Sequence, residues 1–342
     1  MITNALVYRL KEVINSPDLD PYKSEHFDEW LPVYQDLELE QYTNLKSKMA
    51  QGSMGLWQDR TRTIPHYLKL SGWEPLPEVN SSFNKSWKTI CLETAEAIVK
   101  RAAGQKINIS WSGGLDSTCA FFALLEVAGP AQLKIFCNYH SILESGTLFD
   151  KYVRDNNIDF DLTTPVVNPQ FGEGLIVTGY LGDQLYGRYQ TLSPEHFTMP
   201  WKDFITPKQV EFVERILPNW PGQELRTVPD FLNFIELNCK WQMGKTNRMR
   251  NMPKEIADRI INFYETEDFQ KWSLGNYEPK WYDEDLRTYK YSTRLFLRDL
   301  MKSDIYAMNK AVQTSHYHIL QHDWVMMLED GTNLYTKDFK LS

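Results

Sequence analysis

Hydrophobic and polar positions follow two different periods along the middle of the chain. Short apolar runs occupy residues 106–111, 133–139, 158–164 and 174–180, and each has the length of a buried strand. Helical patterns separate the first three runs: residues 117–128, which end before Gly129 and Pro130, and residues 148–157. Strands that alternate with helices of this length predict an α/β fold, a parallel sheet flanked by helices.

The pattern also predicts elements on either side of this region. The apolar face of a helix that starts near residue 87 and stops near Gly104 consists of Trp87, Ile90, Cys91, Ala95 and Ile98. After about residue 205 the chain becomes mostly helical, with apolar segments at 230–243 and 293–301. Residues 324–335 predict a hairpin around Asp330 and Gly331.

The first 85 residues differ from the rest of the chain. They are rich in aromatic side chains and interrupted by prolines, with short helical pieces such as residues 5–14. We expect this N-terminal segment, whose role the sequence does not indicate, to pack against other parts of the protein. We expect residues 86–342 to form one domain, with an α/β part over 86–200 and a mostly helical part over 201–342.

Composition argues against several classes of protein, namely those with a broad basic surface, a zinc or dithiol site, or a membrane-spanning segment. The chain has 342 residues and a formal net charge of −8, which argues against a broad basic surface for nucleic acid. Its four cysteines are widely spaced, which indicates buried reduced thiols rather than a zinc or dithiol site. The sequence shows neither a signal peptide nor a long apolar run, so we expect a soluble, cytoplasmic protein without membrane contact.

The loop "SWSGGLDST", residues 110–118, joins a predicted strand to a predicted helix. Glycines let the backbone approach a phosphate closely, and the helix N-terminus offers unpaired N–H groups. Ser112 and Ser117 add hydroxyl donors, and Asp116 beside a phosphate requires a cation such as Mg²⁺ between them. The alternative is an ordinary capped turn, because Gly, Ser and Asp are common there. The GxxxxGK[ST] and GxGxxG patterns are absent.

The segment "SGGLDS" resembles the pyrophosphate loop of the ATP pyrophosphatase (PP-loop) superfamily, which includes asparagine, GMP and NAD synthetases and several tRNA-modifying enzymes. The resemblance implies an adenine nucleotide alpha hydrolase-like fold in which residues 86–200 bind ATP and residues 201–342 bind the substrate. It implies ATP binding by Trp111, Ser112, Gly113, Gly114, Asp116, Ser117 and Asn138.

A second segment, "VTGYLGDQLYG" at residues 177–187, resembles an asparagine synthetase motif. The match implies that Asp183 binds Mg²⁺ together with Asp116, and that Thr178 and Gly179 contact adenine. The alternative is a glycine-rich turn in which Asp183 caps a helix.

Tyr180 replaces a glutamate of that motif, as in the β-lactam synthetases, where a tyrosine and a glutamate deprotonate the attacking amine. Alignment of residues 230–240 with the family's equivalent helix makes Glu236 the partner of Tyr180. A buried Glu–Tyr pair is a reasonable base, because burial raises the pKa of a carboxyl group. Alternatively, Tyr180 is a core aromatic residue and Glu236 a surface charge.

A third segment, residues 294–315, resembles the late part of asparagine synthetases and places Lys310 on the lysine that stabilises charge on the acyl-adenylate and pyrophosphate. Lys302 is the alternative for this role. In the other interpretation, both are solvated surface lysines, the usual environment of lysine.

We expect no glutamine hydrolysis of the kind that the glutaminase domain of asparagine synthetases performs, because position 2 is Ile2 and the first cysteine is Cys91. We therefore expect an AMP-forming ligase that joins a small-molecule carboxylate to an amine or ammonia. A second copy of the chain and an ammonia-supplying protein are its candidate partners. The alternatives are an enzyme that adenylates a base in tRNA or DNA, for which residues 240–254 are a basic run, and a non-catalytic ATP-binding protein.

Overall fold

The computed structural model describes most of the chain as a series of segments. These are residues 2–3, 17–36, 59–66, 68–71, 74–80, 82–162, 173–187, 192–241, 254–275, 280, 289–303, 324–327 and 333–335. The chain divides into two compact units. The first contains Met1–Glu78, Gly187–Arg250 and Leu320–Ser342, and the second contains Val79–Tyr186 and Asn251–Ile319.

This division differs from the boundary expected after residue 85. The change between units at Glu78 and Val79 lies close to that boundary, but residues 86–342 are not one continuous unit. Residues 187–250 instead share a unit with the N-terminal segment. Hydrophobic periodicity describes each element by itself and does not indicate which distant elements meet. The sequence pattern therefore could not predict that residues 187–250 share a unit with the N-terminal segment.

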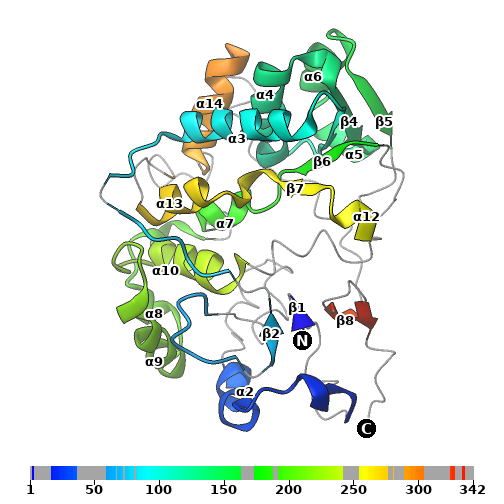
Figure 1. Cartoon of the computed structure of the whole chain (residues 1–342). Coiled ribbons are helices and arrows are strands. Elements are labelled where there is room, and N and C mark those ends of the chain that lie inside the picture. Colours follow the sequence, from blue (N-terminus) through cyan, green and yellow to red (C-terminus); the bar gives the residue numbers. More distant parts are fainter. Residues whose placement is uncertain are drawn as a thin grey trace. The chain divides into compact units, whose positions relative to one another are not determined.

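The second unit contains a five-stranded sheet in which every pair of neighbouring strands is parallel (Figure 1). Its strands are β3 (Ile107–Ser110), β4 (Leu133–Cys137), β5 (Asp159–Leu162), β6 (Leu175–Thr178) and β7 (Ile260–Asn262). The order β5-β4-β3-β6-β7 places β3 at the centre, where all of its residues are buried. This sheet confirms the predicted α/β fold and four of its strands, and β7 is the strand that the sequence pattern missed.

Helices flank this sheet. They are α3 (Trp87–Ala102), α4 (Leu115–Ala128), α5 (Tyr139–Glu144), α6 (Gly146–Phe149), α7 (Gly182–Tyr186), α12 (Lys254–Ala257), α13 (Glu267–Gly275) and α14 (Tyr291–Met301). Helix α4 contacts β3, β4 and β6, and both α3 and α14 pack against α4. The helix expected over residues 148–157 is split between α6 and a π-helical turn, Asp150–Arg154.

Helix α3 shows how local signals and packing agree in the second unit. Its first turn is capped by Ser86, whose hydroxyl accepts the N–H of Thr89 at 3.1 Å, and the helix ends just before Gly104, which has a φ of +82°. All five residues of the predicted apolar face are buried. Trp87 packs against aromatic rings at centroid distances of 4.5–5.8 Å, those of Tyr186, Tyr264, Phe269 and Trp272. This cluster joins α3 to α7 and α13.

The connection order of the sheet places a topological switch point between β3 and β6. The chain runs from β3 outward to β4 and β5, and then returns to β6 on the other side of β3. In open α/β sheets, the carboxyl ends of two strands that lead in opposite directions border a crevice in which ligands bind. Here those strands are β3 and β6, so the loops that follow them are the place to look for a functional site.

The first unit contains shorter elements. They are β1 (Ile2–Thr3), α2 (Phe27–Asp36), β2 (Leu70–Ser71), α8 (Trp201–Phe204), α9 (Pro207–Ile216), α10 (Val228–Phe234), a π-helical turn Ile235–Cys239, β8 (Trp324–Met327) and β9 (Asn333–Tyr335). Strands β8 and β9 pair antiparallel, as the hairpin prediction requires. The helical piece expected over residues 5–14 lies outside the described residues.

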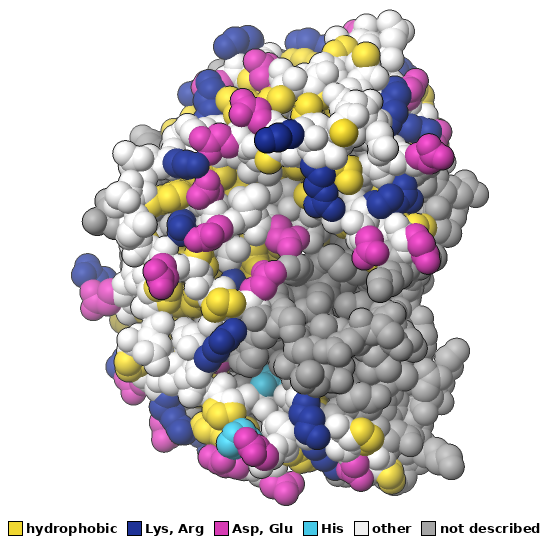
Figure 2. All heavy atoms as spheres, viewed as in Figure 1, with side chains coloured by type: hydrophobic (Ala, Val, Ile, Leu, Met, Phe, Trp, Pro, Cys, Tyr) yellow, Lys and Arg dark blue, Asp and Glu magenta, His cyan; other side chains and the backbone are white. Residues whose placement is uncertain are grey.

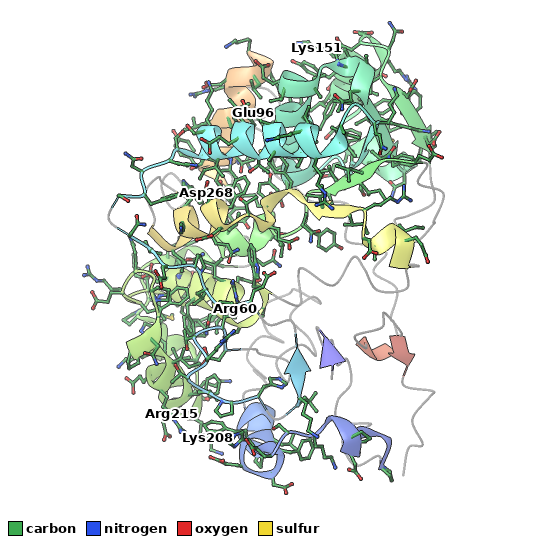
Figure 3. The ribbon with its side chains drawn as sticks, viewed as in Figure 1. Arg60, Glu96, Lys151, Lys208, Arg215 and Asp268 are labelled. Atoms are coloured by element: carbon green, nitrogen blue, oxygen red, sulfur yellow. The ribbon has the colours of Figure 1, made fainter. Side chains whose placement is uncertain are left out.

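Two buried charged residues attach the N-terminal segment to the rest of the first unit. The carboxylate of Asp59 accepts a hydrogen bond from Asn238 Nδ2 at 3.0 Å. The guanidinium of Arg60, a residue labelled in Figure 3, donates to the carbonyl groups of Leu237, Glu74 and Pro75 at 2.8–2.9 Å. The expectation that this segment packs against other parts of the protein is therefore confirmed, and its partner is the π-helical turn after α10.

Two expectations drawn from composition can be compared with the described residues. All four cysteines are buried and unbridged, as expected of reduced thiols. Among the described helices, none has both the length and the apolar character needed to span a membrane.

The pH dependence of stability should depend on His66. Burial lowers its pKa from 6.5 to about 3, while its Nδ1 accepts the N–H of Leu68 at 3.0 Å. Because the unfolded chain then binds the proton more tightly, the contribution of His66 to the free energy of unfolding is fully present above pH 6.5. It falls by up to about 1.4 kcal/mol per unit as the pH drops from 6.5 toward 3.

Urea unfolding at pH 6.5 and pH 5 would measure this effect. The variant His66→Asn keeps an acceptor for Leu68 but does not titrate, so it should lose less stability than the wild type, by up to about 2 kcal/mol. An equal loss in both proteins would contradict the assignment.

Candidate functional site

The loop between β3 and α4 forms a tight turn at the N-terminus of a 14-residue helix. The backbone N–H of Ser112 donates to Ser117 Oγ at 3.1 Å, and Ser117 Oγ donates to the carbonyl of Gly114 at 3.1 Å. Gly113 has a φ of +78°, and a Cβ there would lie 2.6 Å from the carbonyl oxygen of Ser141. The turn therefore requires glycine at position 113 and presents a helix N-terminus, where anions are stabilised.

The loop between β6 and α7 touches this first loop. A Cβ on Gly179 would lie 2.6 Å from the backbone nitrogen of Ser117, so the two loops approach backbone to backbone. Leu181 adopts a left-handed φ of 75°, which is costly for a non-glycine residue. A Cβ on Gly182 would lie 2.4 Å from Cγ of Asp116. The two glycines are what allow Asp116 and the start of α7 to lie in contact.

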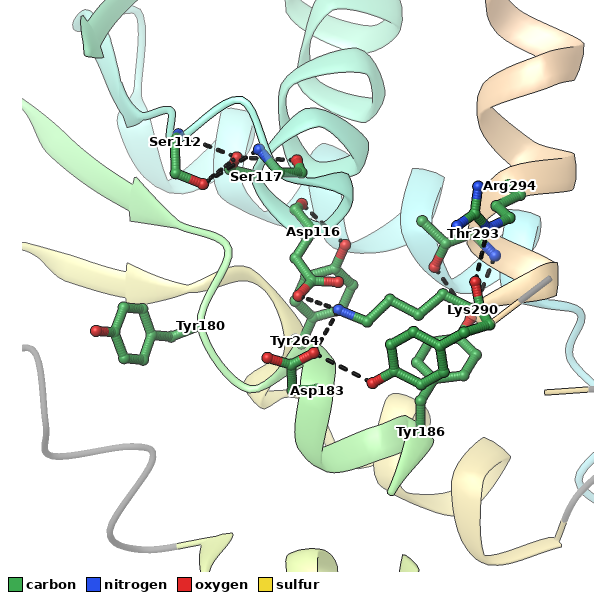
Figure 4. Close-up of polar contacts among 12 residues, drawn as sticks. Ser112, Asp116, Ser117, Tyr180, Asp183, Tyr186, Tyr264, Lys290, Thr293 and Arg294 are labelled. Atoms are coloured by element: carbon green, nitrogen blue, oxygen red, sulfur yellow. Dashed lines mark hydrogen bonds and ion pairs between the residues drawn. The ribbon is translucent and has the colours of Figure 1, made fainter. Parts of the chain in front are cut away.

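Asp116 and Asp183 converge on a single ammonium group, that of Lys290 (Figure 4). Lys290 Nζ lies 2.5 Å from Asp116 Oδ2 and 2.6 Å from Asp183 Oδ1. The lysine side chain is 1% exposed, whereas those of Asp116 and Asp183 are 17% and 20% exposed. The hydroxyl of Tyr289 also donates to Asp183 Oδ1 at 3.2 Å. The two carboxylates are therefore within reach of one cation, which the chain itself supplies.

Two opposing effects act on the pKa of Lys290. Burial lowers the pKa, but the charges of Asp116 and Asp183 and their hydrogen bonds raise it more, so that the pKa lies above its ordinary value of 10.5. The ammonium therefore stays charged, and the group of three side chains carries one net negative charge.

The backbone around Lys290 is held by several hydrogen bonds. Lys290 precedes α14 with a left-handed φ of 61°. Arg294 Nε donates to the carbonyl of Tyr289 at 2.7 Å, and the N–H of Tyr291 donates to the carbonyl of Lys280 at 3.0 Å. These contacts fix the start of α14 and thereby the point from which the lysine side chain extends.

Tyr264 contacts the first turn of α4, which carries Asp116. Its hydroxyl donates to the backbone carbonyl of Asp116 at 3.0 Å. Burial raises the pKa of Tyr264 well above its ordinary value of 10.0. The hydroxyl therefore remains a donor and holds the first turn of α4 in place.

Thr178, at the end of β6, joins a hydrogen-bonded chain of side chains. Its hydroxyl donates to Asn262 Oδ1 at 2.9 Å, and Asn262 Nδ2 donates to Glu265 Oε2 at 3.0 Å. Asn262 is buried at the end of β7. These hydrogen bonds link the segment that is predicted to contact adenine to β7, the strand of the sheet that the sequence pattern missed.

Most of the predicted nucleotide-site residues meet at the carboxyl edge of the sheet. Those in or directly beside the two touching loops are Ser112, Gly113, Gly114, Asp116, Ser117, Thr178, Gly179 and Asp183. Asn138 follows β4, and its side chain caps α5 by accepting the N–H of Ser141 at 2.8 Å. The indole of Trp111 is buried, stacks on Phe149 and donates to Thr118, so its side chain belongs to the core.

The predicted catalytic residues are distributed differently. Tyr180 lies in the second loop, and in Figure 4 its ring points away from Asp116 and Asp183. Glu236 is buried in the first unit, where its Oε1 lies 3.1 Å from Lys240 Nζ, so it is not the surface charge of the alternative interpretation. Tyr180 and Glu236 belong to different units, and their pairing stays a prediction. Lys310 lies outside the described residues.

Sequence reasoning missed Lys290. One local signal pointed to it, because a cation directly before a helix opposes the positive end of the helix dipole. Such a lysine is expected to have a carboxylate partner elsewhere in the chain. The sequence does not indicate which carboxylate this is, because Lys290 lies 174 residues from Asp116.

Two comparisons with known proteins found no match. No protein-family model matches the chain, and no curated protein matches it.

The close contact at Gly182 can be tested by unfolding measurements. Gly182→Ala should displace the Asp116 carboxylate and lower the free energy of unfolding by about 1–3 kcal/mol, because the added methyl group overlaps Asp116. Gly146→Ala is the matched control, since a Cβ there has no neighbour within 4 Å. Equal stability of the two variants in urea would contradict the packing described here.

Proposed function

We propose that this chain is an ATP-dependent carbon–nitrogen ligase that forms AMP and pyrophosphate. A carboxylate oxygen of the substrate attacks the α-phosphorus of ATP, and the bond to the β-phosphate oxygen breaks. An amine or ammonia then attacks the acyl carbon, loses a proton and expels AMP. One observation carries the proposal: the glycine-rich loop before α4 and the Asp116–Asp183 pair meet at the switch point between β3 and β6.

The geometry of the α4 loop supports the nucleotide part of this proposal. A turn that needs glycine at position 113 and leads into a long helix suits a pyrophosphate. The resemblance of residues 112–117 to the PP-loop and of residues 177–187 to asparagine synthetases gives the same assignment. In this proposal the loop binds the leaving pyrophosphate, and Thr178 and Gly179 lie beside the adenine.

The aspartate pair has suitable donors for Mg²⁺. Magnesium binds oxygen ligands and commonly takes one or two carboxylates together with substrate phosphates. Among the described residues no cluster of three or more His, Cys, Asp or Glu side chains forms a metal site, so the remaining ligands would be phosphate oxygens and water. Bound by Asp116 and Asp183, Mg²⁺ would neutralise charge on the leaving pyrophosphate.

Two features count against the alternative of a base-adenylating enzyme. The first lysine of the basic run, Lys240, is buried against Glu236 and does not face a phosphate backbone. On the described part of the face in Figure 2, basic and acidic side chains are interspersed. Binding to nucleic acid relies instead on a contiguous basic patch or stripe.

The reaction products test the proposal directly. Protein, Mg·ATP and the matching carboxylate should give AMP and pyrophosphate, and the carboxylate should promote exchange of labelled pyrophosphate into ATP. Asp116→Asn and Asp183→Asn should each slow this exchange by about 100-fold or more, because each removes a carboxylate that would hold Mg²⁺ against the pyrophosphate.

Asp155→Asn is the control for these variants, because Asp155 is an exposed residue outside the site. Its exchange rate should equal that of the wild type. Formation of ADP and phosphate would refute the ligase assignment.

The predicted Tyr180–Glu236 base acts only after adenylation. Tyr180→Phe should therefore slow amide formation by about 100-fold and leave pyrophosphate exchange unchanged. Glu236→Gln should do the same if Glu236 is the partner. Loss of exchange in Tyr180→Phe would show that Tyr180 acts before the amine attacks, and the base assignment would then be wrong.

A further inference from the structure

The position of the Lys290 ammonium coincides with the place that a bridging metal ion would need. An ion bound by both Asp116 and Asp183 must lie between the two carboxylates, close to an oxygen of each. Lys290 Nζ lies there, at 2.5 Å from one carboxylate and 2.6 Å from the other. The ammonium and a divalent ion cannot share that position.

The lysine is buried more deeply than the carboxylates that hold it. It is 1% exposed, against 17% for Asp116 and 20% for Asp183. Lysine is almost never fully buried unless it is paired. A metal ion that takes both aspartates would leave the ammonium buried beside a dication, a strongly repulsive arrangement.

The backbone gives the ammonium little freedom to withdraw. Lys290 directly precedes α14, whose first turn is fixed by the bonds of Tyr291 to Lys280 and of Arg294 to Tyr289. The side chain can therefore release Asp116 and Asp183 only by rotation about its own bonds, toward another anion within its reach.

We propose that Lys290 is a tethered cation that keeps divalent ions out of the bridging position between Asp116 and Asp183 until a polyphosphate is bound. The polyphosphate supplies the additional negative charge that allows the ammonium and a divalent ion to coexist in the site. This inference rests on the proposed function for the identity of the polyphosphate, which is that of ATP. Its consequence is that metal and nucleotide bind together, and that the metal alone binds weakly.

The experiment measures the affinity of the full-length protein for Mn²⁺ alone, by calorimetry or by the EPR signal of free Mn²⁺. Lys290→Met should bind one Mn²⁺ at least about tenfold more tightly than the wild type, because it removes a like charge from the position of the metal. A purely structural role of Lys290 would instead weaken or abolish metal binding.

The same helix offers a matched control, because Lys302 follows α14 as Lys290 precedes it. Both lysines have a left-handed backbone, with φ of 61° at Lys290 and 52° at Lys302, but Lys302 is exposed. Lys302→Met therefore makes the same change in net charge and in backbone preference, and its Mn²⁺ affinity should equal that of the wild type. Equal affinities of the two variants for Mn²⁺ would overturn the proposal, as would weaker binding by Lys290→Met.

Two further variants keep the test decisive. Lys290→Met combined with Asp183→Asn should return the Mn²⁺ affinity to near the wild-type value, because tight binding needs both carboxylates. If Lys290→Met does not give folded protein, Lys290→Gln removes the charge but keeps an amide that can donate to a carboxylate, and it should bind Mn²⁺ more tightly than Lys302→Met.

Nucleotide binding is measured separately, with a non-hydrolysable ATP analogue and Mg²⁺. If the wild type does not bind the analogue, the proposed function fails, while the comparison of Mn²⁺ affinities still decides the role of Lys290. If it does bind, the coupling between metal and analogue should be smaller in Lys290→Met than in the wild type. Equal coupling in both proteins would overturn the proposal.

Discussion

The site in the second unit depends on one ion pair network, the ammonium of Lys290 between the carboxylates of Asp116 and Asp183. Two like charges about 4 Å apart repel by about 4 kcal/mol at an effective dielectric constant of 20. The ammonium between the two carboxylates attracts both of them and so offsets this repulsion. The lysine therefore stabilises the contact between the two loops and sets the charge of the site.

Several local conformational costs gather around that network. Leu181 and Lys290 both have a left-handed backbone, and two glycines permit contacts that no side chain would allow. Such strain persists only where surrounding contacts impose it, and it is commonly found at functional sites. Here the contacts are the hydrogen bonds that fix α14 and the bond from Tyr264 to Asp116. This strain is concentrated at the switch point of the sheet, where we propose that these loops bind the nucleotide.

In the first unit, buried charged residues hold a turn of the backbone in place. Asp59 and Arg60 satisfy backbone and amide groups around the π-helical turn after α10, and Glu236 in that turn pairs with Lys240 directly after it. A π-helical turn often marks a functional position. The residue that the sequence proposed as half of a base thus lies in an unusual backbone segment, with a lysine as its partner within the unit. The N-terminal segment, whose role the sequence does not indicate, therefore contributes to the packing that holds this turn.

The sequence by itself determined the strands β3, β4, β5 and β6 and the glycine-rich turns, because strand length, helical period and turn chemistry depend on neighbouring residues. The pairing of Asp116 with Asp183 was expected from the resemblance to asparagine synthetases. The sequence did not predict β7, whose three residues carry no period, nor the exchange of segments between the two units. Only the tertiary structure decided that Lys290 joins Asp116 and Asp183, and that Glu236 is paired with Lys240. The reason is that the energy of two charges depends on their distance in space, and for distant residues that distance is set by the packing of the helices and strands between them.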